Sequence, residues 1–458
     1  MAFSATSVYC PALFLTAPAS NQGKTTITAA LARYFTEQGK VVRVFKTGPD
    51  YLDPQILAQA SGQPVEQLDM WMAGEAYCQQ MLFDAAQQAD LILIEGAMGM
   101  FDGEPSSADL AARFNIPLAI VMDVKGMAQT AAAIATGLAN FRQDCQIAGL
   151  IANRCGSERH AQLIRDALPP ELPLLASLTR DDEVTLPERH LGLVQANEVT
   201  DELEQRFTAA VQWLEQSNDC ELLTLPPKVA FFAPITDDTE ALSGAAGQPL
   251  LGKTIAIAKD AAFSFIYDAN LMALNKLGAE YVFFSPLHDK VLPSADALWL
   301  PGGYPELHTQ ALAENLSMRA SIQAFFAANK PILAECGGLL YSLESLTDLE
   351  GKTQPMLGIL AGQGAMRGKR GCQGMQTAVL PEGEVRAHAH HRSRSDNTPE
   401  PIGYGRRQRH PAPGEPIFQV KELTASYLHL FFPSNLTAIA ALFSQRQASA
   451  VTAEGQVA

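Results

Sequence analysis

The sequence predicts an α/β protein of two domains, of which the first is a doubly wound parallel sheet. Apolar runs that read as buried strands alternate with helical segments along the first half of the chain. A stretch rich in Pro, Gly and Asp follows, and the same alternation then restarts at residue 254. A chain of 458 residues is also too long for one hydrophobic core. We therefore expect a first domain at 1–216, an interdomain linker at 217–250 and a second domain at 251–458.

Composition excludes several classes of protein. A formal net charge of −16 argues against non-specific binding to nucleic acid, which needs a basic surface. No stretch reaches the roughly 18 apolar residues of a membrane span, and the N-terminus lacks the basic start of a signal peptide. The seven cysteines form no C-x-x-C pair, so neither a zinc site nor a disulfide framework is indicated. We expect a cytoplasmic protein with reduced thiols and neither nucleic acid nor membrane as a partner.

The first strand leads into a candidate phosphate-binding loop. Residues 12–17 read as a buried strand, residues 27–38 read as a helix, and the loop between them carries Gly-Lys-Thr-Thr at 23–26. This is the context that such a loop requires. Backbone N–H groups would surround the phosphates, Lys24 would reach the terminal ones and Thr25 would bind Mg²⁺. The alternative is a chance Gly-Lys-Thr at a helix start, since no other glycine precedes the motif in this loop.

Two acidic loops follow the next strands. The strand at 41–45 runs into a Gly/Pro-rich loop that carries Asp50 and Asp53. The apolar strand after it ends at Glu95, with Asp102 further out in the same loop. Loops at the carboxyl ends of parallel strands are where α/β sheets bind ligands. An acid directly after an apolar strand is also typical of a Walker-B metal ligand. Asx hydrogen bonds within a turn are the alternative role for the first pair.

Further strands and one helix complete the first domain. The apolar segments are 90–94, 117–122, 147–152 and 174–178, and the helix is 199–216. The second domain restarts with strands at 254–258, 281–284 and 297–300. The last of these ends at Gly302 and Gly303, and consecutive glycines free two backbone N–H groups to face an oxyanion.

Cys336 lies at a predicted sharp turn from strand to helix. Residues 332–334 read as the end of a buried strand, and two glycines follow the cysteine. A thiol at a helix N-terminus is expected to have a lowered pKa and to act as a nucleophile. The alternative is a buried structural cysteine. A strand at 425–431 carries His429, and Cys, Gly-Gly and His together favour a Cys–His acyl-transfer site.

The segment 385–395 is a local cluster of Arg and His on an acidic chain. A metal site made by its histidines is one interpretation. A solvated loop or a contact to an anionic ligand is the interpretation that we favour.

These motifs resemble those of the cobyrinic acid a,c-diamide synthases, which are glutamine-dependent amidoligases of cobalamin biosynthesis. The resemblance runs nearly from end to end of the chain. It rests on the segments 45–53, 95–103, 126–130, 153–160, 187–192, 300–306 and 334–338.

The resemblance implies a dethiobiotin synthetase-like, ATP-dependent P-loop domain and a class I glutamine amidotransferase domain. Glutamine would be hydrolysed at Cys336 with His429 as the base, and ammonia would pass to the first domain. ATP would there phosphorylate the a- and c-carboxylates of cobyrinic or hydrogenobyrinic acid, and ammonia would displace phosphate to give amides. The ligands implied are the corrinoid, glutamine, ATP and Mg²⁺. A homodimer is one oligomeric state that the sequence leaves open.

The resemblance also implies roles for individual residues. The oxyanion would face Gly302, Gly303 and Gly337. ATP would contact Gly23, Lys24, Thr25, Thr26 and Asn153. Magnesium would bind Thr25, Asp50 and Glu95. The corrinoid carboxylate would face Tyr51, Leu52, Asp53 and Asp102.

The chain departs from the family pattern in three places. Phe431 stands where class I amidotransferases carry a Glu two residues after the histidine, so another group would have to orient His429. The segment 387–393 keeps only part of the family's Gly-His-Glu-Phe-His-Tyr-Ser. The phosphate loop has Ala17 and Asn21 where the family usually has glycine.

Two alternative functions differ in class. One is an amidoligase that acts on another tetrapyrrole, such as cobyric acid or a nickel sirohydrochlorin. The other is a P-loop regulatory ATPase whose second domain only binds a partner. Ala19 stands where such ATPases carry a signature Lys, and they would not need the Cys, Gly-Gly and His together.

Overall fold

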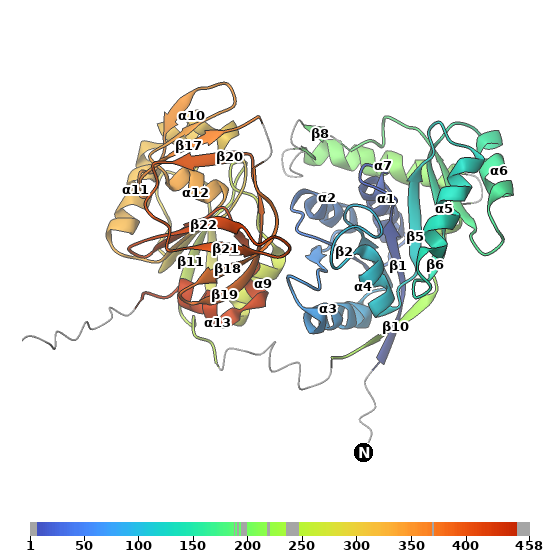
Figure 1. Cartoon of the computed structure of the whole chain (residues 1–458), viewed down its shortest axis with the longest axis horizontal. Coiled ribbons are helices and arrows are strands. Elements are labelled where there is room, and N and C mark those ends of the chain that lie inside the picture. The colour runs from blue at the N-terminus through green and yellow to red at the C-terminus, as the bar shows by residue number, and fades with distance from the viewer. Residues whose placement is uncertain are drawn as a thin grey trace, which may run out of the picture. The chain divides into compact units, whose positions relative to one another are not determined.

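The computed structural model describes residues 7–186, 199–217, 220–234, 247–368 and 371–446. Between the first two ranges it describes only the backbone of a short antiparallel pair, β8 (Glu188–Arg189) and β9 (Gly192–Leu193). The chain divides into two compact units, Met1–Ser243 and Gly244–Ala458 (Figure 1). No helix in these ranges is both long and apolar enough to cross a bilayer.

Unit 1 is built on a parallel sheet with the strand order β3-β2-β4-β1-β5-β6-β7. The strands are β1 (Ser7–Thr16), β2 (Val42–Lys46), β3 (Glu66–Gln67), β4 (Leu91–Glu95), β5 (Leu118–Asp123), β6 (Ile147–Cys155) and β7 (Leu174–Thr179). The helices are α1 (Lys24–Glu37), α2 (Leu52–Ser61), α3 (Glu75–Gln88), α4 (Ser107–Phe114), α5 (Gln129–Phe141), α6 (Glu158–Ala167) and α7 (Thr200–Glu215).

Alternate residues of the buried strands pack against helices on opposite faces of this sheet. Leu13 and Leu15 belong to a core cluster with residues of α1, α2 and α7. Phe14, between them, belongs to a cluster with residues of α3 and α4. The doubly wound parallel sheet predicted for this part of the chain is therefore confirmed.

One part of the predicted linker is wrong. Residues Lys228–Phe232 form β10, which pairs antiparallel with the first half of β1. Val229 and Phe231 are buried there, because an alternating apolar segment can extend the sheet along the exposed start of β1. A one-turn helix, Glu221–Leu223, precedes it. Two parts of the predicted linker, at 218–219 and 235–246, lie outside the described residues.

Unit 2 contains a mixed sheet with the strand order β12-β11-β13-β14-β23-β22-β21-β18-β19-β24. Neighbours are parallel from β12 to β23 and antiparallel beyond. The strands are β11 (Thr254–Ala258), β12 (Glu280–Phe284), β13 (Ala297–Leu300), β14 (Ile332–Glu335), β18 (Gln373–Leu380), β19 (Gly383–His390), β21 (Gly403–Arg407), β22 (Pro413–Val420), β23 (Leu423–Ser426) and β24 (His429–Leu430).

Helices and a smaller sheet complete unit 2. The helices are α9 (Asp268–Lys276), α10 (Thr309–Glu314), α11 (Leu316–Ala327), α12 (Gly337–Ser342) and α13 (Leu436–Leu442), with 3₁₀ turns at Pro305–Leu307 and Phe432–Ser434. The smaller sheet has the order β16-β15-β17-β20, formed by Thr353–Pro355, Ser345–Thr347, Gln363–Met366 and Ser393–Asp396.

The strand predicted at 425–431 is in fact two strands. β23 pairs with β14, whereas β24 pairs with β19 at the other end of the sheet order. Tyr427 and Leu428 carry the chain between them. All of these residues are buried, so the apolar run gives no sign of the change of partner. The break places His429 directly opposite His388 in β19.

Candidate active sites

The loop between β1 and α1 packs closely against Asn153. Gly23 has a φ of 96°, and a Cβ at this position would lie 2.2 Å from Asn153 Nδ2. Only glycine fits such a position. Asn153 Nδ2 donates a hydrogen bond of 2.8 Å to the carbonyl oxygen of Gln22, which joins the loop to the end of β6. The structure thus brings Asn153 to the phosphate loop, and α1 begins there with the N-terminal N–H groups that favour an anion.

Lys24, the first residue of α1, is buried and turned back onto backbone oxygens. Its Nζ donates to the carbonyl oxygen of Met98 at 2.9 Å and to that of Ala19 at 3.4 Å. Burial and, to a smaller extent, the neighbouring Lys46 lower the pKa of Lys24, Glu95 partly opposes both, and the net result is a pKa of about 8. The hydrogen bonds of this ammonium to described residues thus go to backbone oxygens, which suits a group that receives a phosphate.

Thr25 and Glu95 meet at the carboxyl end of β4. Thr25 Oγ1 donates a hydrogen bond of 2.8 Å to Glu95 Oε1. Glu95 is only 1% exposed, and its Oε2 has no hydrogen-bond partner among the described residues. Burial raises the pKa of Glu95, although nearby Lys46 lowers it. The two residues present oxygen donors in one buried place.

Lys46 is a site residue that the sequence analysis missed. It ends β2, and its Nζ lies 3.2 Å from Asp53 Oδ2 and 3.3 Å from Glu95 Oε1. Burial alone would lower the pKa of Lys46, but Glu95 and Asp53 together raise it above its ordinary value. A lysine at the end of an apolar strand was a signal that could have been used, because lysine is rarely buried without a partner.

The loop after β2 places the predicted corrinoid-facing residues at the start of α2. Asp50 Oδ1 accepts the N–H groups of Leu52 at 3.0 Å and Asp53 at 3.3 Å, as the Asx-turn alternative predicted. Tyr51 is the N-cap residue of α2. Burial and the neighbouring Asp50 raise the pKa of Asp53 to about 7, although Lys46 lowers it.

Asp102 makes a hydrogen bond within the loop that follows β4. Its Oδ2 accepts the N–H of Gly99 at 3.1 Å, and a Cβ on that glycine would lie 2.8 Å from the carbonyl oxygen of Pro18. The N–H of Met100 also donates to the carbonyl oxygen of Ala17 at 2.7 Å. The exposed carboxylate of Asp102 therefore lies in a loop whose backbone is hydrogen-bonded to the phosphate loop.

The residues predicted to bind magnesium suit that ion in kind. A hydroxyl and a carboxylate are hard oxygen donors, and Mg²⁺ takes its other ligands from phosphates and water. Glu95 Oε2, buried and unbonded within the described ranges, fits this role. No group of three or more His, Cys, Asp or Glu side chains suited to a metal occurs in those ranges.

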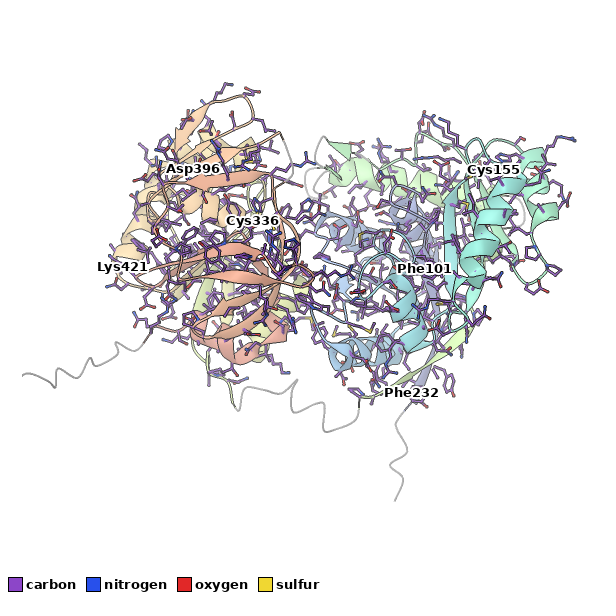
Figure 2. The ribbon with its side chains drawn as sticks, viewed as in Figure 1. Phe101, Cys155, Phe232, Cys336, Asp396 and Lys421 are labelled. Atoms are coloured by element: carbon purple, nitrogen blue, oxygen red, sulfur yellow. The ribbon has the colours of Figure 1, made fainter. Side chains whose placement is uncertain are left out.

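Cys336, labelled in Figure 2, forms the sharp turn from strand to helix that the sequence predicted. It lies between β14 and α12 with a φ of 47° and a ψ of −98°, a conformation that is costly for a residue with a side chain. A Cβ on Gly338 would lie 2.0 Å from the carbonyl oxygen of Leu300, and one on Gly337 would lie 2.9 Å from the N atom of Gly303. The two glycines therefore let the turn pack against the end of β13.

The expected lowering of the thiol pKa is wrong. Cys336 is 5% exposed, and burial raises its pKa above the ordinary value, with Glu306 adding to the effect. The helix that follows is a single short element of six residues, so its dipole does not offset the loss of hydration. The thiol is neutral in this state, and a base must remove its proton as it reacts.

The Gly302–Gly303 loop lies against His429. A Cβ on Gly302 would lie 2.3 Å from His429 Cε1, and one on Gly303 would lie 2.1 Å from the carbonyl oxygen of Ala262. With the contact of Gly337 already described, these distances gather the predicted oxyanion glycines, the thiol turn and the histidine into one region of unit 2.

His429 is buried in a stack of rings. Its ring is parallel to that of His388, with centroids 4.8 Å apart and an interplanar angle of 14°. Burial, with smaller contributions from His390 and His391, lowers the pKa of His429 to about 3. A neutral imidazole can accept a proton from a thiol. Phe431 contacts the ring of Tyr267 edge to face and offers no carboxylate to His429.

Known proteins match both units. Residues 254–436 match the CobB/CobQ-like glutamine amidotransferase domain, and residues 13–194 match the CobQ/CobB/MinD/ParA nucleotide binding domain. The hydrogenobyrinate a,c-diamide synthase of Stutzerimonas stutzeri is 50% identical over 437 residues, which cover 95% of this chain and 99% of that one. The corresponding protein of Pseudomonas aeruginosa is 48% identical, with 96% and 98% covered.

A relative whose name gives a different substrate is nearly as similar. The cobyrinate a,c-diamide synthase of Herminiimonas arsenicoxydans is 45% identical over 427 residues, with 93% of this chain and 95% of that one covered. Among solved structures, a glutamine amidotransferase covers 41% of this chain and 96% of its own at 16% identity and a TM-score of 0.31.

Proposed function

The chain belongs to the family of cobyrinate and hydrogenobyrinate a,c-diamide synthases, and on this premise we propose that it amidates the a- and c-carboxylates of a corrinoid with glutamine as nitrogen donor and ATP as activator. One observation carries the proposal. A single chain holds both a Gly-Lys-Thr loop beside Glu95 and a strained thiol turn beside His429. A nucleotide-dependent ligase with its own ammonia source needs both.

Unit 2 supplies ammonia. Sγ of Cys336 attacks the amide carbon of glutamine, and His429 takes the thiol proton and gives it to the departing ammonia. Backbone N–H groups of Gly303 and Gly337 face the oxyanion. Water then hydrolyses the γ-glutamyl thioester to glutamate and restores the thiol. Since both side chains are buried and neutral, the proton moves only as the carbon–sulfur bond forms.

Unit 1 activates the carboxylate. The γ-phosphoryl group of ATP passes to a carboxylate oxygen of the corrinoid, which yields ADP and an acyl phosphate. Ammonia adds to the acyl carbon, and phosphate leaves as the amide forms. Lys24 balances phosphate charge, and Asn153 lies where the nucleotide would reach the end of β6. Tyr51, Leu52, Asp53 and Asp102 face the corrinoid.

Thr25, Asp50 and Glu95 are the residues that would hold Mg²⁺. When bound, the ion would neutralise negative charge on the phosphate oxygens as the γ-phosphoryl group leaves ADP. Free ammonia is mostly protonated in neutral water, so its production within the protein delivers the neutral nucleophile. We also place the reaction in the cytoplasm, which suits the free cysteines.

Mass spectrometry tests the reaction and the ring together. Cobyrinic acid and hydrogenobyrinic acid are incubated separately with the protein, ATP, Mg²⁺ and glutamine. Two successive conversions of a carboxyl to an amide on one of them support the proposal and identify the ring. No amide on either substrate, with glutamine or with ammonia, contradicts it. Parallel incubations with cobyric acid and with a nickel sirohydrochlorin test the alternative amidoligase, which an amide formed only on one of these would favour.

A further inference from the structure

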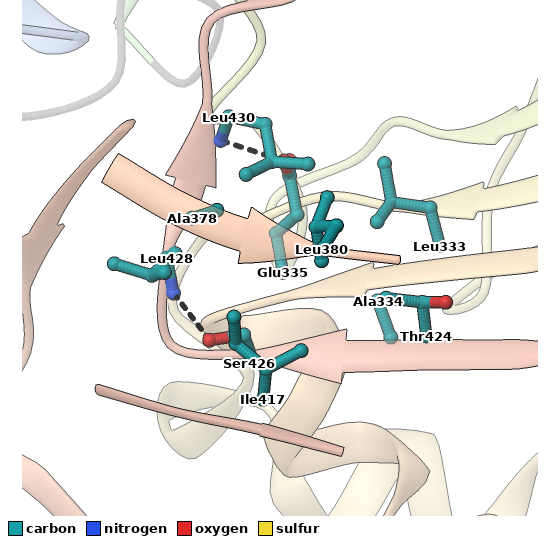
Figure 3. A pocket seen from close by; sticks show the side chains of 10 residues that line it. All are labelled: Leu333, Ala334, Glu335, Ala378, Leu380, Ile417, Thr424, Ser426, Leu428 and Leu430. Atoms are coloured by element: carbon teal, nitrogen blue, oxygen red, sulfur yellow. Dashed lines mark hydrogen bonds between the residues drawn. The ribbon is translucent and has the colours of Figure 1, made fainter. Parts of the chain in front are cut away.

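Glu335 ends β14 and directly precedes Cys336. It is 2% exposed, and both of its carboxyl oxygens accept hydrogen bonds. Oε1 accepts the backbone N–H of Leu430 at 2.8 Å, and Oε2 accepts Trp299 Nε1–H at 2.9 Å. Figure 3 shows the first of these bonds, in which the carboxylate reaches from β14 to the strand that carries His429.

This bond spans a gap in the sheet. β14 pairs with β23, whereas β24 pairs with β19, so no backbone ladder joins the strand of the thiol to the strand of the histidine. The covalent path between β23 and β24 runs through Tyr427 and Leu428. Because Glu335 adjoins Cys336 and Leu430 adjoins His429, this bond joins the backbone next to one reacting residue to the backbone next to the other.

The bond lies on the face of the sheet opposite the thiol. Leu430 packs in a core cluster with Leu333 and Leu380, whereas Cys336 packs in a different cluster with Leu339. Successive residues of a strand point to opposite faces, which accounts for this arrangement. The Glu335 side chain therefore lies on the face of the sheet opposite the thiol and would not contact the substrate.

Burial of a carboxyl group at this position has a cost in free energy. Burial raises the pKa of Glu335, its two hydrogen bonds partly oppose this, and the net result is a pKa of about 8. Beside it lies a cavity of about 10 Å³ whose lining is mostly apolar, with Leu333, Ala378 and Leu380 among its residues (Figure 3). A buried polar group in such surroundings is weak evidence for a stabilising role, and one use of such groups is to specify an arrangement.

We propose that Glu335 is the positioning residue that fixes His429 relative to Cys336. Phe431 occupies the position at which class I amidotransferases carry a Glu. Because it has no polar group, it cannot make a hydrogen bond to His429. In this chain the acid holds the backbone next to the histidine instead, while His388 stacks on the ring. The inference rests on the proposed glutamine hydrolysis in unit 2.

The substitution Glu335→Gln tests this role. A glutamine keeps the shape but has only one carbonyl oxygen, so its NH₂ group must face either Leu430 N–H or Trp299 Nε1–H. The probe is 6-diazo-5-oxo-norleucine, a glutamine analogue that loses N₂ as its methylene carbon bonds to the thiol. Labelling of Cys336 gives a maximal rate, kinact, and a half-saturating concentration, KI, and assays of glutamate release accompany it.

We expect kinact and the kcat of glutamate release to fall about tenfold to hundredfold, because small displacements of reacting groups have effects of this size. KI is expected to stay within about twofold, since the glutamine pocket is unchanged, and amidation with ammonia is expected to be unaffected. Trp299→Phe leaves the bond to Leu430 and should lower kinact by only about twofold to fivefold. Thr424→Val alters the lining of the same cavity and removes a hydrogen bond from Arg446 rather than one to Glu335, so kinact, KI and amidation should stay at their wild-type values.

The outcomes separate the possible failures. Unchanged kinact in both Glu335→Gln and Trp299→Phe overturns the inference while the proposed function stands. A KI that rises as much as kinact falls, or an equal loss in Thr424→Val, also overturns it, because either indicates general damage. If Glu335→Gln does not fold, the result for Trp299→Phe decides. A wild-type chain that neither releases glutamate nor is labelled at Cys336 instead overturns the proposed function.

Discussion

Thr25 Oγ1 and Glu95 Oε1 lie 2.8 Å apart, so the first turn of α1 and the carboxyl end of β4 meet at a hydrogen bond. Lys46 Nζ approaches the same carboxylate oxygen at 3.3 Å, while Oε2 is left without a hydrogen bond from any described residue. One oxygen of Glu95 is thus occupied by protein and the other is available. This division is what a carboxylate needs if it is to bind an ion and stay fixed in place.

Glu95→Gln is expected to lower amidation about 100-fold or more with either nitrogen source, since several kcal/mol of charge stabilisation by the metal ion is lost. Glutamate release in unit 2 should remain. Product formation with glutamine and with ammonium salts measures the effect. Glu75→Gln is the control, because it removes an exposed carboxylate that pairs with Arg113. Full activity of Glu95→Gln with ammonia would remove Glu95 from the metal site.

Local features of both sites could be predicted from the sequence, but relations between strands could not. The positions of Glu95 and Cys336 follow from apolar runs and the glycines around them, which are properties of neighbouring residues. Lys46 was missed because its role depends on register: it lies directly beside Glu95 in the parallel pair of β2 and β4. The change of strand partner before His429 and the antiparallel pairing of β10 with β1 also depend on relations between strands, so the sequence did not predict them.

The thiol pKa shows a second limit. The turn at Cys336 predicts exposure and a helix N-terminus, and both would lower the pKa of a thiol. Burial of the side chain is a property of the whole fold, and it reverses the direction.

Cys336→Ala is expected to abolish amidation with glutamine and to leave amidation with ammonia at the wild-type rate. The thiol forms the bond to glutamine, whereas ammonia enters the reaction after that step. Initial rates with saturating glutamine and then with ammonium chloride at fixed pH measure the difference. Cys372→Ala, which removes a thiol outside the proposed site, is the control and should keep both activities. An equal loss of both activities in Cys336→Ala would contradict a division of labour between the two units.

Gly338→Ala tests the packing of the thiol turn. The new Cβ would lie 2.0 Å from the carbonyl oxygen of Leu300, so the turn or β13 must move. We expect glutamate release to fall about 100-fold, since a shift near 1 Å suffices for that loss. Overpacking should also lower the free energy of unfolding by about 1–3 kcal/mol. Enzyme assays and thermal unfolding measure the two effects.

Gly368→Ala is the matched control for this change, because a Cβ there meets no atom of the described residues within 4 Å. Its rate and melting temperature should equal those of the wild type. A Gly338→Ala chain with normal glutamate release would show that the turn tolerates a side chain, and the argument from close packing would fail.

The last prediction concerns pH. His429 works as a base only when it is neutral, and an ordinary histidine becomes protonated as the pH falls through about 6.5. Burial lowers the pKa of His429 to about 3, so the ring stays neutral throughout the range from neutral pH down to pH 5. The kcat/KM for glutamine hydrolysis, which reports the free enzyme, should therefore not follow an ionisation near 6.5. A tenfold fall for each pH unit below 6.5 would contradict the burial of the base. Glutamate release between pH 5 and pH 8 measures this profile, and samples returned from pH 5 to pH 7 must recover full activity, which separates titration of His429 from unfolding of the chain.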